Sequence, residues 1–372
     1  MRQTAVKVLL VSPLERNGLT GGQARAGTIL SECLQQSERI VLCHCQQPHS
    51  QLARNQLERG LQRLRHYLSF IRLMFRQRPG IVHFFCPCSR QAIYEKAIMG
   101  LLGQIFKAKT LINLRNDPLP MYTRSSALQQ WIIRKALFVH TGAICQYSDL
   151  KGFFIEEIGL DESRVFVIHN AVKPFRSDKV QWSAQQRFRA RRVVFLGSLQ
   201  PRKQVEVLLE SLALLKHRPP IFLDVIGDAQ PPEYLSRLRQ HACDQGVLDR
   251  VTFHGPLFGE RKRVVLQQGS LLALPSLSEG FPNVSLEAAQ LGLPVVLSSV
   301  GAAKDIKLAF RAGVHLVNAY DVGGFSHAID YLLGNEETYQ ICSWAATKGA
   351  GRFSVDAMRD QVISAYWATL NN

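Results

Sequence analysis

Residues 270–298 of the chain read SLLALPSLSEGFPNVSLEAAQLGLPVVLS. The apolar run at 270–273 predicts a buried strand, and apolar residues at three- and four-residue spacing predict a helix over 283–291. Gly292 suits the turn that ends such a helix, and a second apolar run follows at 294–298. A strand, a helix and another strand in this order indicate a parallel sheet covered by helices.

The same alternation continues in both directions along the chain. Apolar runs predict further strands at 6–12, 39–45, 80–85, 109–114, 142–146 and 165–168 in the first half, and at 192–196, 221–226 and 251–253 in the second. Helices are predicted at 28–34, 204–215, 233–244 and 260–268. Between the two series, residues 173–192 hold little periodic apolar content and have the composition of a linker.

The pattern predicts an α/β protein with two Rossmann-like domains facing across a cleft. The first domain is expected to span 1–175, a linker 176–191 and the second domain 192–352. Ligands of open α/β sheets bind outside the carboxyl ends of the strands. We therefore look for functional residues in the loops that follow strands.

Positive charge is concentrated in the first half of the chain. Residues 1–180 hold 25 Lys and Arg against 12 Asp and Glu, a net of +13, whereas the rest holds 20 against 17, a net of +3. A basic half favours an acidic partner: nucleic acid, an anionic membrane or a phosphorylated substrate. The sequence has no run of 18 or more apolar residues, which a membrane span would need, and its N-terminal apolar run is too short for the core of a signal peptide. We therefore expect a cytoplasmic protein.

The eight cysteines include two C-x-C pairs, at 43–45 and 86–88, and no C-x-x-C pair. Their places in or just after apolar runs indicate reduced, buried thiols in a cytosolic protein. The alternative is a metal site that combines the two pairs with His44 and His83, although structural zinc sites use longer ligand spacings.

Two acidic residues flank the start of the predicted helix at 283–291. Helix N-termini expose free amides and a partial positive charge, which favour phosphate. Glu279 lies in the loop before the helix, where it can accept hydrogen bonds from sugar hydroxyls. Glu287 lies one to two turns into the helix, where it can hold a ribose diol.

A second group of charged residues follows the strand at 192–196. The strand ends at Gly197, and after a short turn Arg202 and Lys203 stand where a helix begins. Two cations at this place can neutralise a diphosphate leaving group as it separates from a sugar. The simpler interpretation is a pair of solvated cations at a helix end.

The seven residues between Glu279 and Glu287 resemble the E-x7-E motif of the family-four retaining glycosyltransferases (glycosyl transferases group 1), which have the GT-B fold. The resemblance implies that Glu279 and the amides after it contact the donor sugar and that Glu287 holds the nucleotide ribose. The donor-binding residues that it implies are Gly22, Gly197, Gly280, Phe281, Pro282, Asn283 and Glu287, and the catalytic residues are Lys203, Arg202 and Glu279.

Other segments extend the resemblance. Residues 197–203 are similar to the family's G-R-x(n)-K-G element, except that Ser198 stands in place of its Arg, and Arg202 is the candidate to supply that charge. Gly21-Gly22, 168–172 (IHNAV) and 251–255 (VTFHG) are similar to a phosphate-covering loop, an I-P-N-G-V element and a V-x-F-x-G element. Residues 353–372 are expected to form a helix that crosses back to the first domain.

Many members of the family have a histidine after the fourth strand, where this chain has Arg115 or Asn116. Arg115 and Asp117 are candidates for the acceptor side of the site. No nucleophile is evident, so we favour front-face displacement, in which the departing phosphate takes the acceptor proton and the configuration of the sugar is retained. Since Lys203 and helix amides supply positive charge, we expect no cofactor and no metal requirement.

Five apolar residues repeat at helical spacing among six arginines between positions 59 and 78: Leu61, Leu64, Leu68, Ile71 and Phe75. The simpler interpretation is a helix that covers the first sheet and whose arginines are merely solvated. A second interpretation adds that the arginines with Leu and Phe attract an anionic membrane leaflet, and both can hold at once. Docking would suit a lipid-linked saccharide acceptor. We expect a hexosyltransferase of cell-envelope polysaccharide, lipopolysaccharide or glycolipid synthesis, peripheral on the inner face of the cell membrane, with a UDP- or GDP-sugar as its donor.

Three other functions agree with parts of the sequence. A nucleotide-dependent oxidoreductase also uses two Rossmann domains, but the chain lacks G-x-G-x-x-G after Gly21 or Gly197. A sugar-nucleotide epimerase shares the architecture, yet the E-x7-E helix favours transfer. Nucleic-acid binding would use the net charge of +16, but no nucleic-acid module is recognised and the basic residues are not interleaved with stacking aromatics, so we expect no nucleic-acid partner.

Overall fold

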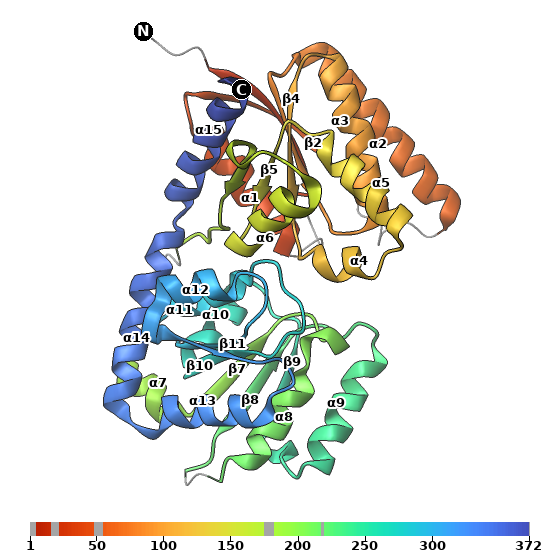
Figure 1. Ribbon diagram of the computed structural model, residues 1–372. Coiled ribbons are helices and arrows are strands. Elements are labelled where there is room, and N and C mark those ends of the chain that lie inside the picture. The colour runs from red at the N-terminus through yellow and green to blue at the C-terminus, as the bar shows by residue number, and fades with distance from the viewer. Residues whose placement is uncertain (1–4, 16–21, 48–54, 175–181, 217–218, 372) are drawn as a thin grey trace. The chain divides into compact units, whose positions relative to one another are not determined.

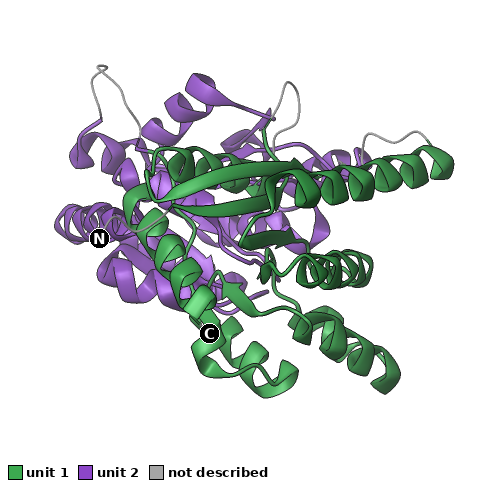
Figure 2. Cartoon of the chain, turned by 90° about the horizontal axis from the view of Figure 1, so that it is seen from above, with its two compact units in different colours: residues 1–173, 355–372 green, residues 174–354 purple. Residues whose placement is uncertain are grey.

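The computed structural model of the chain describes residues 5–15, 22–47, 55–174, 182–216 and 219–371. The chain forms two compact units, which Figure 2 colours separately. Met1–Lys173 and Val355–Asn372 make up the first unit, and Pro174–Ser354 make up the second. Helix α7 (Ala184–Ala190) lies inside the range expected as a linker, because Ser183 and Gln186 form a capping box that starts it.

The first unit contains a six-stranded parallel sheet with the order β2-β1-β3-β4-β5-β6 (Figure 1). Its strands are β1 (Val6–Ser12), β2 (Ile40–Gln46), β3 (Ile81–Cys86), β4 (Lys109–Leu114), β5 (Gly142–Cys145) and β6 (Val165–Val167). Strand β3 is buried along its whole length, as expected where helices cover both faces of a parallel sheet. Because β1 lies between β2 and β3, the two C-x-C pairs are not on neighbouring strands.

Helices α1 and α15 pack together on one face of this sheet, and α2, α3 and α5 lie on the other (Figure 1). The helices of the unit are α1 (Gly22–Gln35), α2 (Gln56–Gln77), α3 (Arg90–Ile105), α4 (Leu119–Thr123), α5 (Ala127–Phe138), α6 (Ser148–Gly152) and α15 (Val355–Asn371). Helix α15 is held in the core by the Tyr366 hydroxyl, which lies 2.8 Å from Nδ1 of His83. The predicted return of the C-terminal helix to the first domain is confirmed.

The second unit contains a second six-stranded parallel sheet, with the order β12-β11-β10-β7-β8-β9. Its strands are β7 (Arg192–Leu196), β8 (Phe222–Ile226), β9 (Val251–Gly255), β10 (Leu271–Leu274), β11 (Val295–Ser298) and β12 (Val314–Val317). The helices that cover it are α8 (Val205–Leu214), α9 (Glu233–Asp244), α10 (Gly259–Gln268), α11 (Asn283–Gln290), α12 (Ala303–Phe310), α13 (Val322–Gly334) and α14 (Glu336–Ala350).

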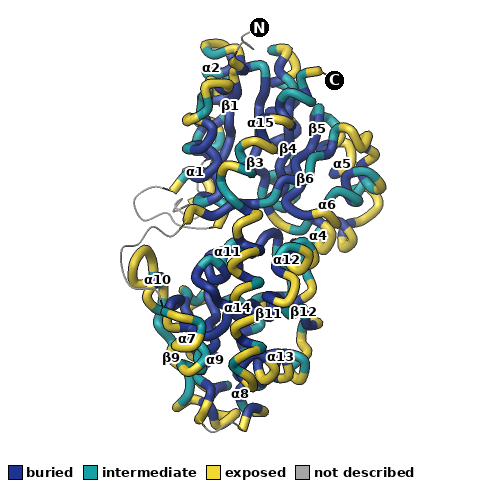
Figure 3. Tube along the Cα trace, turned by 90° about the vertical axis from the view of Figure 1, so that its left-hand side faces the viewer, coloured by how far each residue is buried: buried dark blue, intermediate teal, exposed yellow. Residues whose placement is uncertain are grey.

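Each sheet confirms the prediction of a Rossmann-like domain, and Figure 3 shows the strands of both largely buried. In the second sheet, β8 and β9 extend from one side of β7, and β10, β11 and β12 extend from the other. The strand order therefore reverses between β7 and β10. Open α/β sheets bind their ligands outside the carboxyl ends of the strands, at such a switch point.

Three buried histidines tie the stability of the first unit to pH. Burial lowers the pKa of both His83 and His140 to about 3 and that of His66 to about 4. Below the ordinary histidine pKa of 6.5, the unfolded chain binds protons that these folded side chains do not, so stability must fall as pH falls from 6.5.

We predict that His140→Leu removes the contribution of one of these histidines to the pH dependence of the unfolding free energy. Neither ring nitrogen of His140 has a hydrogen-bond partner, so the substitution leaves no partner unsatisfied. Between pH 6.5 and 5, the loss in unfolding free energy should be about 2 kcal/mol smaller in the variant, measured by urea unfolding. The exposed His327→Leu is the control. An equal loss in His140→Leu and in the unsubstituted chain would contradict this assignment.

Candidate functional site

The loops after β7 and β10 are joined at the switch point of the second sheet. After β7, the chain forms a single 3₁₀ turn, Pro201–Lys203. The backbone amide of Leu277, in the loop after β10, donates to the Arg202 carbonyl at 2.8 Å. The Arg202 guanidinium donates in return to the Ser278 carbonyl at 3.1 Å. These bonds hold the two loops side by side.

Lys203 and Glu279 form an ion pair between these loops. The Glu279 carboxylate also accepts a hydrogen bond of 2.7 Å from the Ser276 hydroxyl. Both charged side chains are mostly buried, with 12% of Lys203 and 15% of Glu279 exposed. The two residues that sequence analysis placed in different motifs are therefore direct partners, and a ligand that binds either one must compete with the other.

The start of α11 lies immediately after Glu279. The Phe281 ring is buried and packs edge-on against Phe353 at 5.6 Å. The Pro282 carbonyl accepts from both the amide and the hydroxyl of Ser285, at 2.9 and 2.7 Å. The helix begins at Asn283 as predicted. Its first-turn amides give this end a partial positive charge next to the Lys203–Glu279 pair.

Glu287, in the middle of α11, is buried and paired with a lysine. Only 2% of the residue is exposed, and its Oε2 accepts a hydrogen bond of 2.6 Å from Nζ of Lys262 on α10. Sequence analysis missed Lys262. The Arg-Lys-Arg run at 261–263 was the available signal, but nothing local to that run indicates contact with α11.

Gly301 supports the backbone of the Glu279 loop. Its φ is +55°, and a Cβ placed there would lie 2.2 Å from the Glu279 carbonyl oxygen and 2.6 Å from that of Gly280. The Gly280 carbonyl also accepts a hydrogen bond of 2.9 Å from the amide of Ala302. Only glycine allows both the positive φ and this close approach. The loop after β11 therefore packs against the loop after β10 and fixes the position of its backbone.

The remaining predicted residues lie in both units. Gly197 continues β7, its amide donating at 3.0 Å to the Ile226 carbonyl. Gly22 is exposed at the first position of α1, which begins earlier than the predicted residue 28 because Ala24 and Ala26 are good helix formers. Gly21 lies outside the described residues.

Arg115 is buried at the end of β4. Its guanidinium donates to Oδ1 of Asn170 at 2.9 Å and lies over the Phe85 ring, 4.3 Å from its centre. Burial lowers its pKa to about 9. Asp117 is half-buried and accepts a hydrogen bond of 3.0 Å from the amide of Leu119. Asn170 belongs to the IHNAV segment, so this contact gives that element a physical role.

A chain of polar contacts runs from Arg115 into the core of the first unit. The guanidinium reaches Oδ1 of Asn113 at 3.4 Å, and the Asn113 amide lies 3.3 Å from Nε2 of His83. The other ring nitrogen of His83 contacts the Tyr366 hydroxyl on α15. His83 is fully buried, as expected for a packed strand histidine. Within the described ranges, no three His, Cys, Asp or Glu side chains gather in a way that could hold a metal ion.

Helix α2 exposes the stripe that could have covered the sheet. Its buried residues are His66, Phe70 and Met74, and it contacts β2. The predicted stripe points away, with Leu61 47%, Leu64 55%, Leu68 57% and Phe75 65% exposed. Helix α2 thus covers the first sheet, as one interpretation predicted, but it packs through another face, and Ile71 is a half-buried residue of the stripe. Periodicity locates an apolar stripe but not the face that packs. No helix in the described part of the chain is long and apolar enough to cross a membrane.

The second half of the chain is similar in sequence to known glycosyltransferases. Residues 190–335 match the family described as Glycosyl transferases group 1. The D-inositol 3-phosphate glycosyltransferase of Mycobacterium marinum is 31% identical over 217 residues, which are 55% of this chain and 45% of that protein. The Streptomyces griseus enzyme of the same name is 31% identical over 191 residues, 48% of this chain and 39% of that one. The chain thus matches less than half the length of these relatives.

Solved structures share the fold over nearly the whole chain. Anabaena HepE, crystallised in complex with UDP, has a TM-score of 0.72 at 17% identity, covering 96% of this chain and 98% of that one. Sucrose-phosphate synthase from Thermosynechococcus elongatus has a TM-score of 0.77 at 16% identity, covering 97% and 98%. The lipopolysaccharide outer core galactosyltransferase WaaB has a TM-score of 0.65 at 15% identity, covering 97% and 99%. These likenesses establish the GT-B fold.

We predict that Gly301→Ala displaces the Glu279 loop and destabilises the second unit. Gly259→Ala is a matched control, because Gly259 has a φ of +54° and open space around its Cβ position. The control measures the cost of the positive φ alone, about 1 kcal/mol. Gly301→Ala should cost at least about 1 kcal/mol more in urea unfolding. Equal losses in the two variants would show that the loop does not rest on Gly301.

Proposed function

Residues 190–335 belong to the glycosyl transferases group 1 family, and from this premise we propose that the chain is a retaining glycosyltransferase. It moves a sugar, of the hexosyl type, from a UDP- or GDP-sugar to an acceptor. The observation that carries the proposal is the Lys203–Glu279 ion pair at the switch point of the second sheet, beside the start of α11. It brings a cation and a carboxylate together next to the N-terminal end of that helix.

When the donor binds, it replaces Glu279 as the partner of Lys203 and Lys203 as the partner of Glu279. The diphosphate takes Lys203 and the amides at the start of α11, and the freed Glu279 accepts hydrogen bonds from the sugar hydroxyls. Because the two side chains are mostly buried, neither charge can be left without a partner. The donor supplies both partners at once, an anion for the lysine and hydroxyl donors for the carboxylate. A free sugar or a free phosphate supplies only one.

We propose Arg202 as the second cation of the site, because this chain has Ser198 where the family has an arginine. Its guanidinium is anchored by the Gln200 side chain at 3.0 Å and by the Ser278 carbonyl at 3.1 Å, and the residue remains exposed. An arginine held in this way keeps donors available for a phosphate oxygen. The departure from the family's G-R element is thus compensated within the same turn.

Glu287 holds the ribose of the nucleotide in the proposed complex. Its carboxylate is already fixed in place by Lys262, so one oxygen is oriented before a ligand arrives. Vicinal hydroxyls donate well to a carboxylate. We add Lys262 to the donor site as the residue that positions Glu287.

The reaction needs no nucleophile from the protein. The bond between the anomeric carbon and the phosphate oxygen breaks, and the acceptor oxygen bonds to the same face of that carbon. The acceptor proton passes to the departing phosphate oxygen. Lys203, Arg202 and the α11 amides stabilise the negative charge that develops on the phosphate. The configuration of the sugar is retained because attack and departure share one face.

The acceptor is proposed to bind on the first unit and to come from a membrane. Asp117 is the residue that we place on the acceptor side, with Arg115 buried beneath it as the support for Asn170. The exposed apolar stripe of α2 carries arginines on the same helix, which favours an anionic leaflet. Neighbouring helices add exposed apolar residues: Ile98, Leu101 and Ile105 on α3, and Leu128 and Trp131 on α5. These features support a lipid-linked saccharide acceptor, envelope polysaccharide or glycolipid synthesis, and a peripheral position on the inner face of the cell membrane.

We predict that Glu287→Gln weakens nucleotide-sugar binding by at least tenfold, about 1.4 kcal/mol, because a neutral amide is a poorer acceptor for the ribose diol. Affinity is measured by titration with the UDP- or GDP-sugar that stabilises the unsubstituted chain most in a thermal-shift panel. Glu260→Gln, which alters an exposed carboxylate paired with Arg263 on α10, is the control. Unchanged affinity in Glu287→Gln would remove this residue from the donor site.

We also predict that the double variant Leu64→Glu and Leu68→Glu loses binding to phosphatidylglycerol vesicles while keeping its stability. Both side chains are more than half exposed, so the folded core does not need them. Each inserted leucine contributes about 1.5–3 kcal/mol when fully buried, so affinity should fall at least tenfold in vesicle sedimentation. Leu308→Glu, at a 74% exposed position on α12, should sediment like the unsubstituted chain. Equal sedimentation of all three proteins would refute docking through α2.

A further inference from the structure

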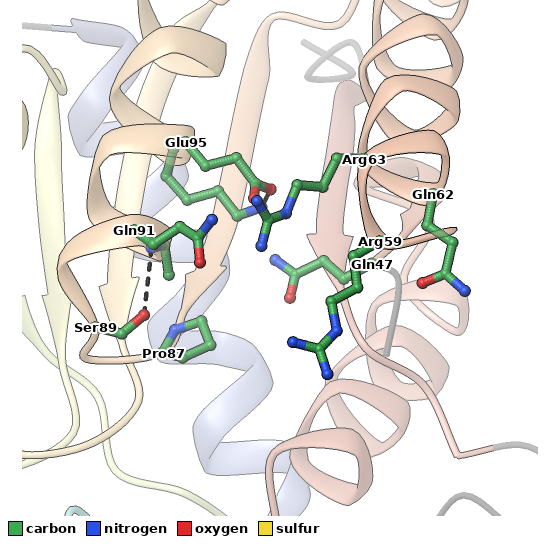
Figure 4. A pocket seen from close by; sticks show the side chains of 10 residues that line it. Gln47, Arg59, Gln62, Arg63, Pro87, Ser89, Gln91 and Glu95 are labelled. Atoms are coloured by element: carbon green, nitrogen blue, oxygen red, sulfur yellow. Dashed lines mark hydrogen bonds and ion pairs between the residues drawn. The ribbon is translucent and has the colours of Figure 1, made fainter. Parts of the chain in front are cut away.

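A polar cavity of about 220 Å³ lies in the first unit between α2 and α3. Figure 4 shows Arg59 and Arg63 extending from α2 toward this space, with the Gln47 side chain between the two helices. Gln47 and Pro87, which also line it, follow β2 and β3, so the cavity opens at the carboxyl ends of these strands. That edge is where open α/β sheets bind ligands.

Arg59 and Arg63 lie on the side of α2 that borders the cavity, where Arg59 is exposed and Arg63 is half-buried. Positions 59, 63, 66, 70 and 74 follow helical spacing, and the last three are the buried residues that pack α2 onto the sheet. At this spacing, apolar residues would normally continue the buried face. The helix instead places arginines there, while its leucines point outward. The two arginines therefore face a polar cavity and not the core.

The charges around the cavity are unbalanced. Arg59, Arg63 and Lys96 line it against one carboxylate, Glu95. That carboxylate is used by Lys96, whose Nζ lies 2.7 Å from its Oε1 and which is 3% exposed. Among the described residues, neither Arg59 nor Arg63 pairs with an acid. The cavity thus holds two guanidinium groups that an anion can bridge.

The N-terminus of α3 adds partial positive charge to the same cavity. Ser89 caps this 16-residue helix, accepting the Ala92 amide at 3.3 Å, the contact dashed in Figure 4. Ser89, Gln91 and Ala92 all line the cavity. The positive end of a helix dipole therefore points at the space that the arginines border.

We propose that this cavity binds a phosphate group of the acceptor. Guanidinium forks bind phosphate oxygens in pairs, and the first-turn amides of α3 supply further donors. The volume is several times that of one water molecule, so the cavity holds the phosphate with part of the molecule attached. The inference rests on the proposed transferase activity, and it gives the acceptor a chemical class: a phosphate or diphosphate ester. A lipid diphosphate and a soluble sugar phosphate share this chemistry.

The test titrates inorganic pyrophosphate into the full chain by calorimetry. All proteins carry Lys203→Ala, which weakens the diphosphate site on the second unit and leaves the cavity as the tighter site. Adding Arg63→Gln should weaken binding at least tenfold, and adding Arg59→Gln should do the same. Adding Arg72→Gln, an exposed arginine of α2 that does not line the cavity, should leave the affinity unchanged. No binding to the parent, or equal affinities in the Arg63→Gln and Arg72→Gln proteins, would overturn the proposal.

Two further arms separate the remaining questions. Two probes are tested with Arg63→Gln and Arg72→Gln: phosphatidylcholine vesicles that carry a polyprenyl diphosphate, and a soluble sugar 1-phosphate. The probe whose binding depends on Arg63 identifies the source of the phosphate. Nucleotide-sugar titration of the chain with native Lys203 is run in parallel. If nucleotide sugars do not bind but pyrophosphate binding still depends on Arg63, the transferase proposal fails and the anion site stands. If nucleotide sugars bind and no probe depends on Arg63, the cavity proposal fails alone.

Discussion

The reversal of strand order between β7 and β10 is the constraint on which the site of the second unit depends. Parallel strands place their carboxyl ends at one edge, and because β7 pairs with β10 the loops after these two strands begin next to each other at that edge. Lys203 and Glu279 are 76 residues apart in the chain, yet they meet because of this pairing. Gly301, after β11, then supports the Glu279 loop from the next position along the same edge.

Buried charge follows a common pattern in this site. Each of the two carboxylates of the E-x7-E helix and its preceding loop has a lysine partner, Lys203 for Glu279 and Lys262 for Glu287. A carboxylate this far from solvent needs such a partner to remain charged. The pairs keep the acids oriented before a ligand binds, which lowers the cost of ordering them afterwards. In the proposed donor complex, the same charges would also contact the donor.

Sequence analysis predicted the two sheets and the helix that begins at Asn283, because these depend on local periodicity. The donor-binding roles of Glu279 and Glu287, which the family resemblance implies, stay predictions. The sequence could not predict the Lys262–Glu287 pair or the burial of Arg115 against Asn170, since both contacts join segments far apart in the chain. Sequence analysis left open whether the stripe of α2 faces the sheet or a membrane, because two faces of that helix have helical spacing and only packing decides between them. The cavity lined by Arg59 and Arg63 depends on the same choice of face.

The stereochemistry of the product shows whether the chain carries out retaining transfer from a donor held by Lys203 and Glu279. The chain is incubated with the nucleotide sugar that it binds and with a membrane lipid extract, and the anomeric configuration of the product is determined by NMR. We expect a product with the configuration of the donor, and at least a hundredfold slower transfer by Lys203→Ala, about 2.7 kcal/mol. An inverted product, or transfer that is unchanged in Lys203→Ala, would contradict this mechanism.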